Sequence, residues 1–587
     1  MPIINQERKL FTLDRAALLL LALTPLVVNP WLSDPFGLPQ RVVFHFGVAL
    51  LCLVSFVRNL NRPIALPRWL CLFGTMALLG IAVSTIQSRN PWEVLPQAGT
   101  WILLFPWLGL LRPTSLEKRG VRNLLLVGVL QVILGVMEIS FLPGPFRVES
   151  FPTRFKFFGT LGNPQYVAIF LGMLSFFLIY PGALLLSRRV RLFLGIAFTV
   201  GFLIAGSQTV ALALFGTVLV MGILTRRRSV LWVSLFALVA LLVFFYPHSH
   251  TIRGRWLINQ IAWKVGGEAF GMGVGLDHFQ HYFLETQRAL FNSGAFDAFK
   301  QNAAFTRRAH NEYLDFYVEG GILLFSAFLI LLVVLAKGIW RTRQTPNANS
   351  AIVLFTLLVS WAAFPFHIIA TLLVFAVAAL SLLETGPQRT ISIPREAIAL
   401  PFAIFVGVLL TQDATSVLAS FHGSRAHDFA VNGKVEAAKG EALRALHADP
   451  ESLEWKLLLA RLNYRLFLPE KSLALLDEMD ALETSVDSLK LRGVILIDRK
   501  EYAAAQRVYR ILNEAIPWQI TSPYHLGEIY LAQGFREEAK KEFQEALRRR
   551  PTNLKAILDQ ATAEKRIAQL EITVPVPRML GPVHSPD

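Results

Sequence analysis

Hydrophobic residues in this chain gather into long runs over the first 415 positions, and short polar segments separate these runs. A helix that crosses a bilayer needs about 20 apolar residues. The pattern therefore predicts an all-α polytopic bundle of about 12–13 membrane spans within residues 1–415. The predicted spans lie near 16–33, 41–58, 68–86, 98–111, 121–141, 164–186, 190–205, 209–225, 229–247, 319–337, 351–367, 369–384 and 396–413.

Basic residues are concentrated in every second connection between these runs. With the N-terminus inside, the Arg and Lys clusters all fall on the same side, as expected of cytoplasmic loops. The clusters lie at 58–68, 112–122, 188–191, 226–228, 337–343 and 389–395. Thirteen spans place the C-terminal part of the chain outside, and one span fewer would place it in the cytoplasm. The longest loop of the membrane part, residues 248–309, is predicted to lie outside.

The hydrophobic pattern changes to a helical repeat after the last predicted span. In the segment starting at Ser522, small and aromatic residues stand at tetratricopeptide spacing, and related units precede it. Paired helices of this kind bury a continuous core between neighbouring units. The sequence therefore predicts a soluble α-solenoid over residues 419–570 that binds a protein partner, followed by a flexible tail over 571–587.

Composition supports a membrane protein and excludes several other classes. Of the 587 residues, 54% are apolar and only 17% are charged, whereas soluble domains carry about 25% charged residues. The net charge of +16 could suggest nucleic acid, but residues 421–570 hold 23 basic and 22 acidic residues. The excess therefore lies among the spans, where it sets orientation, and no nucleic-acid partner is expected. The two cysteines, Cys52 and Cys71, both lie in apolar runs and predict neither a disulfide framework nor a metal site.

The outer loop ends in a polar segment that carries the best candidate for acid–base chemistry. His310 stands where this segment enters an apolar helix, followed by Asn311 and, nine residues later, Glu319. On a continuous helix His310, Tyr313 and Tyr317 would share a face. A histidine there can accept a proton from a hydroxyl group. The alternative is an interfacial histidine beside aromatic anchors.

Basic residues near helix starts on the outer side form the second candidate group. Arg154 and Lys156 precede the sixth span, and Arg253 and Arg255 lie in the large loop. Basic residues beside a helix N-terminus make a good anion site, and the guanidinium groups of arginines bind phosphate oxygens in pairs. Binding of lipid headgroups explains them equally well. A polar break at Ser207–Gln208 between two short spans also suits a site or a tight hairpin.

Motifs for nucleotide, zinc and serine-nucleophile chemistry are missing from the sequence. The glycines of "GMGVGLDHF", from Gly271, lack the strand that precedes a dinucleotide loop. They predict a turn that packs at the membrane surface. No metal and no cofactor is expected.

Taken together, these segments resemble the O-antigen ligase and polymerase superfamily of bacterial envelope membrane proteins. The resemblance covers roughly residues 150–385, and the repeats resemble extensions of some family members. The family motifs are a G-x-x-x-N-P helix start, a polar break, R-x-x-W, G-x-G-x-x-x-F, H-N-x-Y-L and E-x-G. They match Gly159–Pro164, Ser207–Gln208, Arg253–Trp256, Gly273–Phe279, His310–Leu314 and Glu319–Gly321.

The resemblance implies a glycosyltransferase of the inner membrane. Such an enzyme transfers a glycan from undecaprenyl diphosphate to a periplasmic hydroxyl group, without metal or nucleotide. The acceptor is the lipid A core for a ligase, a growing polysaccharide for a polymerase, or a protein for the related oligosaccharyltransferases. His310 would activate the acceptor and Arg253 or Arg255 would bind the diphosphate. Arg154, Lys156, Gln208, Asn311 and Glu319 complete the candidate substrate-binding set. Gln208 departs from the family, which commonly has arginine there.

Two other classes of function fit parts of the sequence. Interrupted spans suit a transporter of lipid-linked glycans, although no acidic residue is predicted inside a span for ion coupling. A membrane scaffold whose work is done by the repeats is the other alternative.

Overall fold

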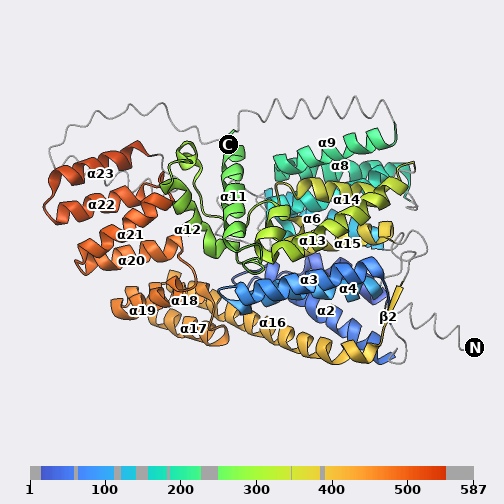
Figure 1. Ribbon diagram of the computed structural model, residues 1–587, viewed down its shortest axis with the longest axis horizontal. Coiled ribbons are helices and arrows are strands. Elements are labelled where there is room, and N and C mark those ends of the chain that lie inside the picture. The colour runs from blue at the N-terminus through green and yellow to red at the C-terminus, as the bar shows by residue number, and fades with distance from the viewer. Residues whose placement is uncertain are drawn as a thin grey trace, which may run out of the picture. The chain divides into compact units, whose positions relative to one another are not determined.

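A computed structural model gives the fold of the chain. It describes residues 13, 15–58, 64–110, 120–139, 157–180, 186–226, 249–344, 347–383 and 390–549. The fold class is all-α, and the strands within these ranges are β1 (Ile64–Pro67) and β2 (Thr390–Ile393), which pair antiparallel (Figure 1). Arg154, Lys156, the predicted span at 229–247 and the tail at 571–587 lie outside the described residues.

The chain divides into two compact units, and each is described by itself. Unit 1 comprises residues 1–279 and 307–455, and unit 2 comprises 280–306 and 456–587. The predicted outer loop at 248–309 is therefore shared between the two units. The predicted boundary at 415–419 lies inside one continuous helix, α16 (Arg395–Val431).

Unit 1 is a bundle of long apolar helices around one hydrophobic core. Besides an N-terminal helix over Arg15–Leu26, these helices are α2 (Gly37–Arg58), α3 (Arg68–Gln87), α4 (Pro91–Leu110), α6 (Val121–Ile139), α7 (Pro164–Ile179), α8 (Arg188–Ala205), α9 (Gln208–Leu224), α13 (Glu312–Arg341), α14 (Ala348–Val359), α15 (Ile369–Leu383) and α16. The more polar helices α11 (Ser249–Glu268) and α17 (Val435–Ala448) complete it, with short 3-10 turns at Thr24–Leu26, Gly159–Leu161 and Pro365–His367.

Five described helices are long and apolar enough to cross a membrane. They are Gly37–Val57, Arg68–Gln87, Val121–Glu138, Glu312–Arg341 and Ala397–Val431. Their outer faces expose large apolar side chains, as Leu53 and Val57 of α2 do at 59% and 65%. Shorter apolar helices account for several of the other predicted spans.

The helix α13 is bent where a glycine turn packs against it. Gly321 has φ 69° inside α13, and the N–H of Ile322 donates to the Gly271 carbonyl over 2.7 Å. A Cβ atom on Gly273 would lie 2.5 Å from the Gly321 nitrogen, so only glycine permits this approach. The turn expected at 271–275 is present and packs against α13, and α11, a helix and not a strand, precedes it.

The C-terminal part consists of antiparallel helix pairs, as the repeat pattern predicted. They involve α18 (Leu453–Arg465), α19 (Pro469–Asp480), α20 (Val486–Asp498), α21 (Tyr502–Ala515), α22 (Thr521–Ala532) and α23 (Arg536–Arg548), which Figure 1 shows stacked in order. In the α20–α21 and α22–α23 pairs a glycine of the first helix faces an aromatic ring of the second. A Cβ on Gly493 would lie 2.6 Å from the Tyr509 ring, and one on Gly527 would lie 2.7 Å from Phe543. This close approach is the structural reason for the small residues of the tetratricopeptide-like repeat.

Candidate functional site

The junction between the outer loop and α13 holds His310 in an unusual backbone conformation. His310 has φ 53°, in the left-handed region that L-residues other than Asn, Asp and His seldom adopt. The Asn311 side chain caps α13 by accepting from the Tyr313 N–H over 3.1 Å. Asp315 Oδ1 accepts from the Ala309 N–H over 3.0 Å. These two bonds hold the backbone on both sides of His310, and such strain persists only where its surroundings impose it.

The predicted helical face of His310, Tyr313 and Tyr317 is wrong, because α13 begins only at Glu312. The Tyr313 hydroxyl donates to the Leu357 carbonyl over 2.8 Å. The Tyr317 ring packs against Trp263, with 5.1 Å between the ring centroids. His310 therefore stands apart from both tyrosines, and its own ring lies 5.4 Å from that of Phe364.

His310 is partly buried, and within the described ranges its imidazole makes no hydrogen bond. Burial lowers the pKa of His310 to about 4, and the positive charges of Arg255 and Arg308 act in the same direction. The ring is thus neutral near pH 7 and both nitrogens are available. A neutral imidazole without a partner can accept a proton from a hydroxyl group placed beside it.

Arg255 connects the outer loop to the polar break at Ser207–Gln208. It lies on α11, and its Nη1 atom donates to the Thr209 hydroxyl over 2.9 Å. Thr209 belongs to the first turn of α9, directly after the polar break at Ser207. Burial lowers the pKa of the Arg255 guanidinium. The loop segment, the break and His310 therefore belong to one site.

The remaining candidate residues fall in different surroundings. Arg253 also lies on α11, but its side chain is exposed. Gln208 begins α9, and its side chain is outside the described part of the structure. Asn311 has a sufficient structural role as the cap of α13. Glu319 is only 1% exposed, so its side chain is enclosed by the protein.

Arg308 is a site residue that the sequence argument did not select. Its Nη2 atom lies 3.0 Å from Asp277 Oδ1, and its guanidinium lies 5.9 Å from the centre of the Phe364 ring. The same ring packs against His310. The motif "RRAHN" contains Arg308, but only the fold shows that its charge acts on His310.

Buried acidic side chains lie along the first two turns of α13. Glu312, Asp315 and Glu319 are 0%, 2% and 1% exposed. Asp315 Oδ2 and Glu319 Oε1 make no hydrogen bond within the described residues. The sequence pattern predicted no acidic residue inside a span, whereas the candidate span begins at Glu312 and includes all three. Their spacing of three and four residues, which places them on one helix face, was visible in the sequence.

A histidine from the turn before α15 completes this buried network. His367 Nδ1 lies 3.2 Å from Glu312 Oε2, and the Phe366 N–H donates to Glu312 Oε1 over 2.8 Å. Ligand atoms of Glu312, Asp315 and His367 lie within 4.8 Å of one another, a spacing that could admit a cation. Since Glu312 already pairs with His367 and a backbone N–H, we interpret the group as an ion-pair network.

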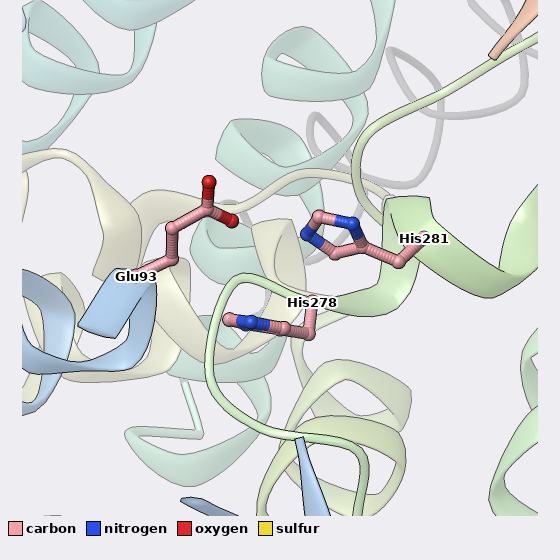
Figure 2. Close-up of side chains that lie close together, drawn as sticks. All are labelled: Glu93, His278 and His281. Atoms are coloured by element: carbon pink, nitrogen blue, oxygen red, sulfur yellow. The ribbon is translucent and has the colours of Figure 1, made fainter. Parts of the chain in front are cut away.

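A second group of histidines is explained by the backbone contacts that they make. Figure 2 shows Glu93 from α4, His278 from the loop before α12 (Phe279–Asn292) and His281 from the first turn of α12. Both ring nitrogens of His278 approach carbonyl oxygens, those of Leu276 at 2.9 Å and Asn90 at 2.8 Å. His278 thus ties the glycine turn to the start of α4. His281 belongs to unit 2, where it pairs with Glu483.

An apolar cavity of about 440 Å³ lies among the helices of unit 1. Phenylalanine rings from several helices line it, among them Phe73, Phe105, Phe316, Phe328 and Phe366. Phe316 follows Asp315 and Phe366 precedes His367, so one wall of the cavity borders the buried ionic network. Its lining suits an aliphatic chain.

No protein-family model matches this chain. No curated protein matches it either.

The chain has structural similarity to several solved helical-repeat proteins, all at low TM-scores. For YrrB, described as a TPR protein with an unusual peptide-binding site, the TM-score is 0.22 with 20% identity over 28% of this chain and 86% of that one. For MamA these values are 0.22 and 20%, over 31% of this chain and 91% of that one. For yeast Tom70 the TM-score is 0.19 with 12% identity, over 75% of this chain and 96% of that one. With scores this low, the tetratricopeptide-like character of the C-terminal part rests on its own helix pairs.

Proposed function

We propose that this protein is a membrane glycosyltransferase that moves a glycan from undecaprenyl diphosphate to an acceptor hydroxyl, as O-antigen ligases do. The observation that carries the proposal is His310, a neutral imidazole in a left-handed backbone conformation on which the positive charges of Arg255 and Arg308 act. A base next to cationic groups suits a reaction in which a hydroxyl loses a proton and a diphosphate leaves.

The proposed reaction uses His310 and Arg255 in separate roles. The imidazole of His310 accepts the acceptor's hydroxyl proton while that oxygen forms a bond to the anomeric carbon. The bond between this carbon and the diphosphate oxygen breaks, and the undecaprenyl diphosphate leaves with the electron pair. Arg255, anchored by Thr209, stabilises the charge that develops on the diphosphate.

Binding of the donor would also raise the pKa of His310. In the free protein, burial together with the charges of Arg255 and Arg308 keeps the pKa of His310 low. A diphosphate beside Arg255 offsets part of this positive charge, so the pKa of His310 rises in the complex. His310 thereby becomes a stronger base when the donor is present.

The apolar cavity supports a lipid-linked donor. Its phenylalanine-lined wall can receive part of an isoprenoid chain, and five described helices are long and apolar enough to cross a membrane. The proposed location is the bacterial inner membrane, with the outer loop and the repeats in the periplasm. The proposed acceptor is the lipid A core; a growing polysaccharide or a protein hydroxyl would make the protein a polymerase or an oligosaccharyltransferase instead.

The test is transfer in proteoliposomes that contain only this protein. The donor is an undecaprenyl-diphosphate-linked glycan, and lipid A core, polysaccharide and protein acceptors are supplied in parallel. Asn tolerates the left-handed backbone that His310 adopts and cannot act as the base near neutral pH. The His310→Asn variant should therefore fold normally and lose at least about a hundredfold in rate.

His447→Ala, a change at an exposed histidine of α17, serves as the matched control and should retain the rate of the unmodified protein. An equal rate for His310→Asn, or no product with any acceptor from folded protein, would refute the proposal. The acceptor that is consumed separates the ligase from the other two activities.

A lipid-glycan transporter is the second candidate, and the buried carboxylates of α13 favour it. Acidic groups within spans commonly couple transport to protons or ions. In the same proteoliposomes, movement of the donor across the bilayer without product, abolished by Glu319→Gln, would favour this function.

A further inference from the structure

The outer loop is not a free connection, because its central segment forms part of unit 2. This segment, residues 280–306, comprises most of α12 and the 3-10 turn Asp297–Asn302. It belongs to the same compact unit as the repeats from Lys456 onwards. We call residues 280–306 the arm.

Specific polar contacts join the arm to the repeats. Arg288 Nε donates to Glu514 Oε2 over 2.6 Å, and the Gln287 amide donates to the Ala515 carbonyl over 2.9 Å in a buried position. Both partners lie at the end of α21. The Trp518 indole N–H, in the following connection, donates to the Ala303 carbonyl.

A further ion pair and extensive burial hold α12 in place. His281 Nδ1 lies 3.0 Å from Glu483 Oε2, with side-chain exposures of 0% and 9%. The apolar side chains of α12 are buried, including Phe283 at 0% and Leu284 at 3%. The arm is thus a docked element and not a flexible loop.

Within unit 1, an ion pair joins the two residues that flank the arm. Asp277, before the arm, pairs with Arg308, after it, over 3.0 Å. His310 follows Arg308 by two positions. The Arg308 charge in turn acts on His310. The arm ends at Thr306, so Arg308 and His310 follow it by two and four positions in the chain.

We propose that the repeats hold the arm and thereby position Arg308 and His310 for the reaction. The repeat surface at Glu483, Glu514 and Trp518 then has a segment of the same chain as its partner. In this inference, which rests on the proposed function only for the identity of the reaction, Arg288 and Glu514 are positioning residues. It also requires that the arm and the repeats lie on the same side of the membrane.

Charge reversal of the Arg288–Glu514 pair tests the contact without any substrate. Hydrogen exchange of the full-length protein is measured for peptides that cover the arm and for peptides that cover 307–316. In Arg288→Glu and in Glu514→Arg, exchange of both regions should rise at least about fivefold, since the pair is partly exposed and reversal adds repulsion. The double variant, Arg288→Glu with Glu514→Arg, should restore the protection.

Arg461→Glu provides the matched control. It reverses one charge of the exposed Arg461–Asp487 pair, 3.0 Å apart within the repeats, and leaves the arm untouched. Exchange of the arm and of 307–316 should not change in this variant. Faster exchange confined to the arm would overturn the positioning role, and unchanged exchange in both reversal variants would overturn the contact itself.

Transfer activity gives the second readout. The single reversals should lower kcat with little change in the donor KM, and the double variant should recover most of the loss. If the exchange results hold while no transfer is found for any variant, the proposed function fails and the arm contact stands. If transfer is normal while 307–316 exchanges faster, the positioning inference fails.

Discussion

The Nη1 atom of Arg255 donates a hydrogen bond to the Thr209 hydroxyl over 2.9 Å, and this bond links α11 to the first turn of α9. The two residues are 46 positions apart in the chain. The bond fixes a guanidinium whose positive charge acts on His310. It anchors the proposed diphosphate ligand, whose charge also acts on the proposed base.

Replacing Arg255 should change both the rate and its pH dependence. Arg255→Gln removes a positive charge that lowers the pKa of His310, so this pKa should rise from about 4. His310 accepts a proton only when neutral, and kcat/KM falls as the pH drops through its pKa. The acid limb of kcat/KM, near pH 4 in the unmodified protein, should therefore move to higher pH. The rate at pH 7 should fall by about 10²–10³-fold because a charge that stabilises the leaving group is lost.

Thr209→Val is the companion variant for this measurement. It keeps the size of the side chain and the Arg255 charge but removes the hydrogen-bond acceptor. The rate should fall by only about tenfold, the effect of one bond to a charged group, and the acid limb should stay near pH 4. An acid limb that is the same in Arg255→Gln as in the unmodified protein would show that Arg255 does not act on the base.

Gly321 should be intolerant of substitution because the bend in α13 depends on it. Its φ of 69° disfavours any side chain, and an added Cβ would lie 2.5 Å from the Gly271 carbonyl oxygen. Gly321→Ala should lower the free energy of unfolding by about 2–3 kcal/mol. Gly267→Ala, at a helical glycine of α11 with no atom within 4 Å of the added Cβ, should be neutral or slightly stabilising. Thermal unfolding in detergent compares the two, and equal stabilities would contradict this account of the bend.

The buried hydrogen-bonded pair of His45 on α2 and Asp413 on α16 should be sensitive to loss of one partner only. His45 Nδ1 lies 2.7 Å from Asp413 Oδ2, with side-chain exposures of 0% and 2%, and His45 Nε2 lies 2.8 Å from the Thr100 hydroxyl. Asp413→Ala should destabilise the protein by about 1–3 kcal/mol, because it leaves the buried His45 imidazole without its hydrogen-bond partner. Replacing both His45 and Asp413 by leucine should lower the free energy of unfolding much less than Asp413→Ala does.

An exposed ion pair on α11 serves as the control for the His45–Asp413 pair. Glu268→Ala removes the partner of Lys264, which lies 3.8 Å away on the protein surface. The free energy of unfolding should change by no more than about 0.5 kcal/mol. Chemical unfolding of the three variants gives the comparison, and a small effect of Asp413→Ala would mean that water already reaches the pair.

Parts of the candidate site could be predicted from the sequence, and parts could not. The polar segment before α13 stood out because it interrupts a hydrophobic pattern, so His310 was found. Its backbone conformation was not, since the helix was expected to include His310, whereas Asn311 caps it one residue later. The acidic face of α13 was missed for a related reason. The predicted span began at Glu319, and the helix begins seven residues earlier.

The sequence alone does not distinguish between the two loop arginines, Arg253 and Arg255. Successive residues of an α-helix are rotated by about 100°, so Arg253 and Arg255 point to nearly opposite sides of α11. The sequence indicates both, and only the packing of α11 decides that Arg255 is half-buried while Arg253 is exposed. Arg308 was overlooked because its partner Asp277 is distant in sequence.

The long apolar helices and the paired helices of the repeats could be predicted from the amino-acid sequence alone. Both follow from local periodicity of hydrophobic and small residues, which acts over a few turns of one helix or between neighbouring helices. The tertiary structure alone decided that the arm at 280–306 docks on the repeats, that Arg255 reaches Thr209, and that His310 is strained and neutral. Each of these depends on residues far apart in the chain, and their burial and charges act on one another only after the helices have packed.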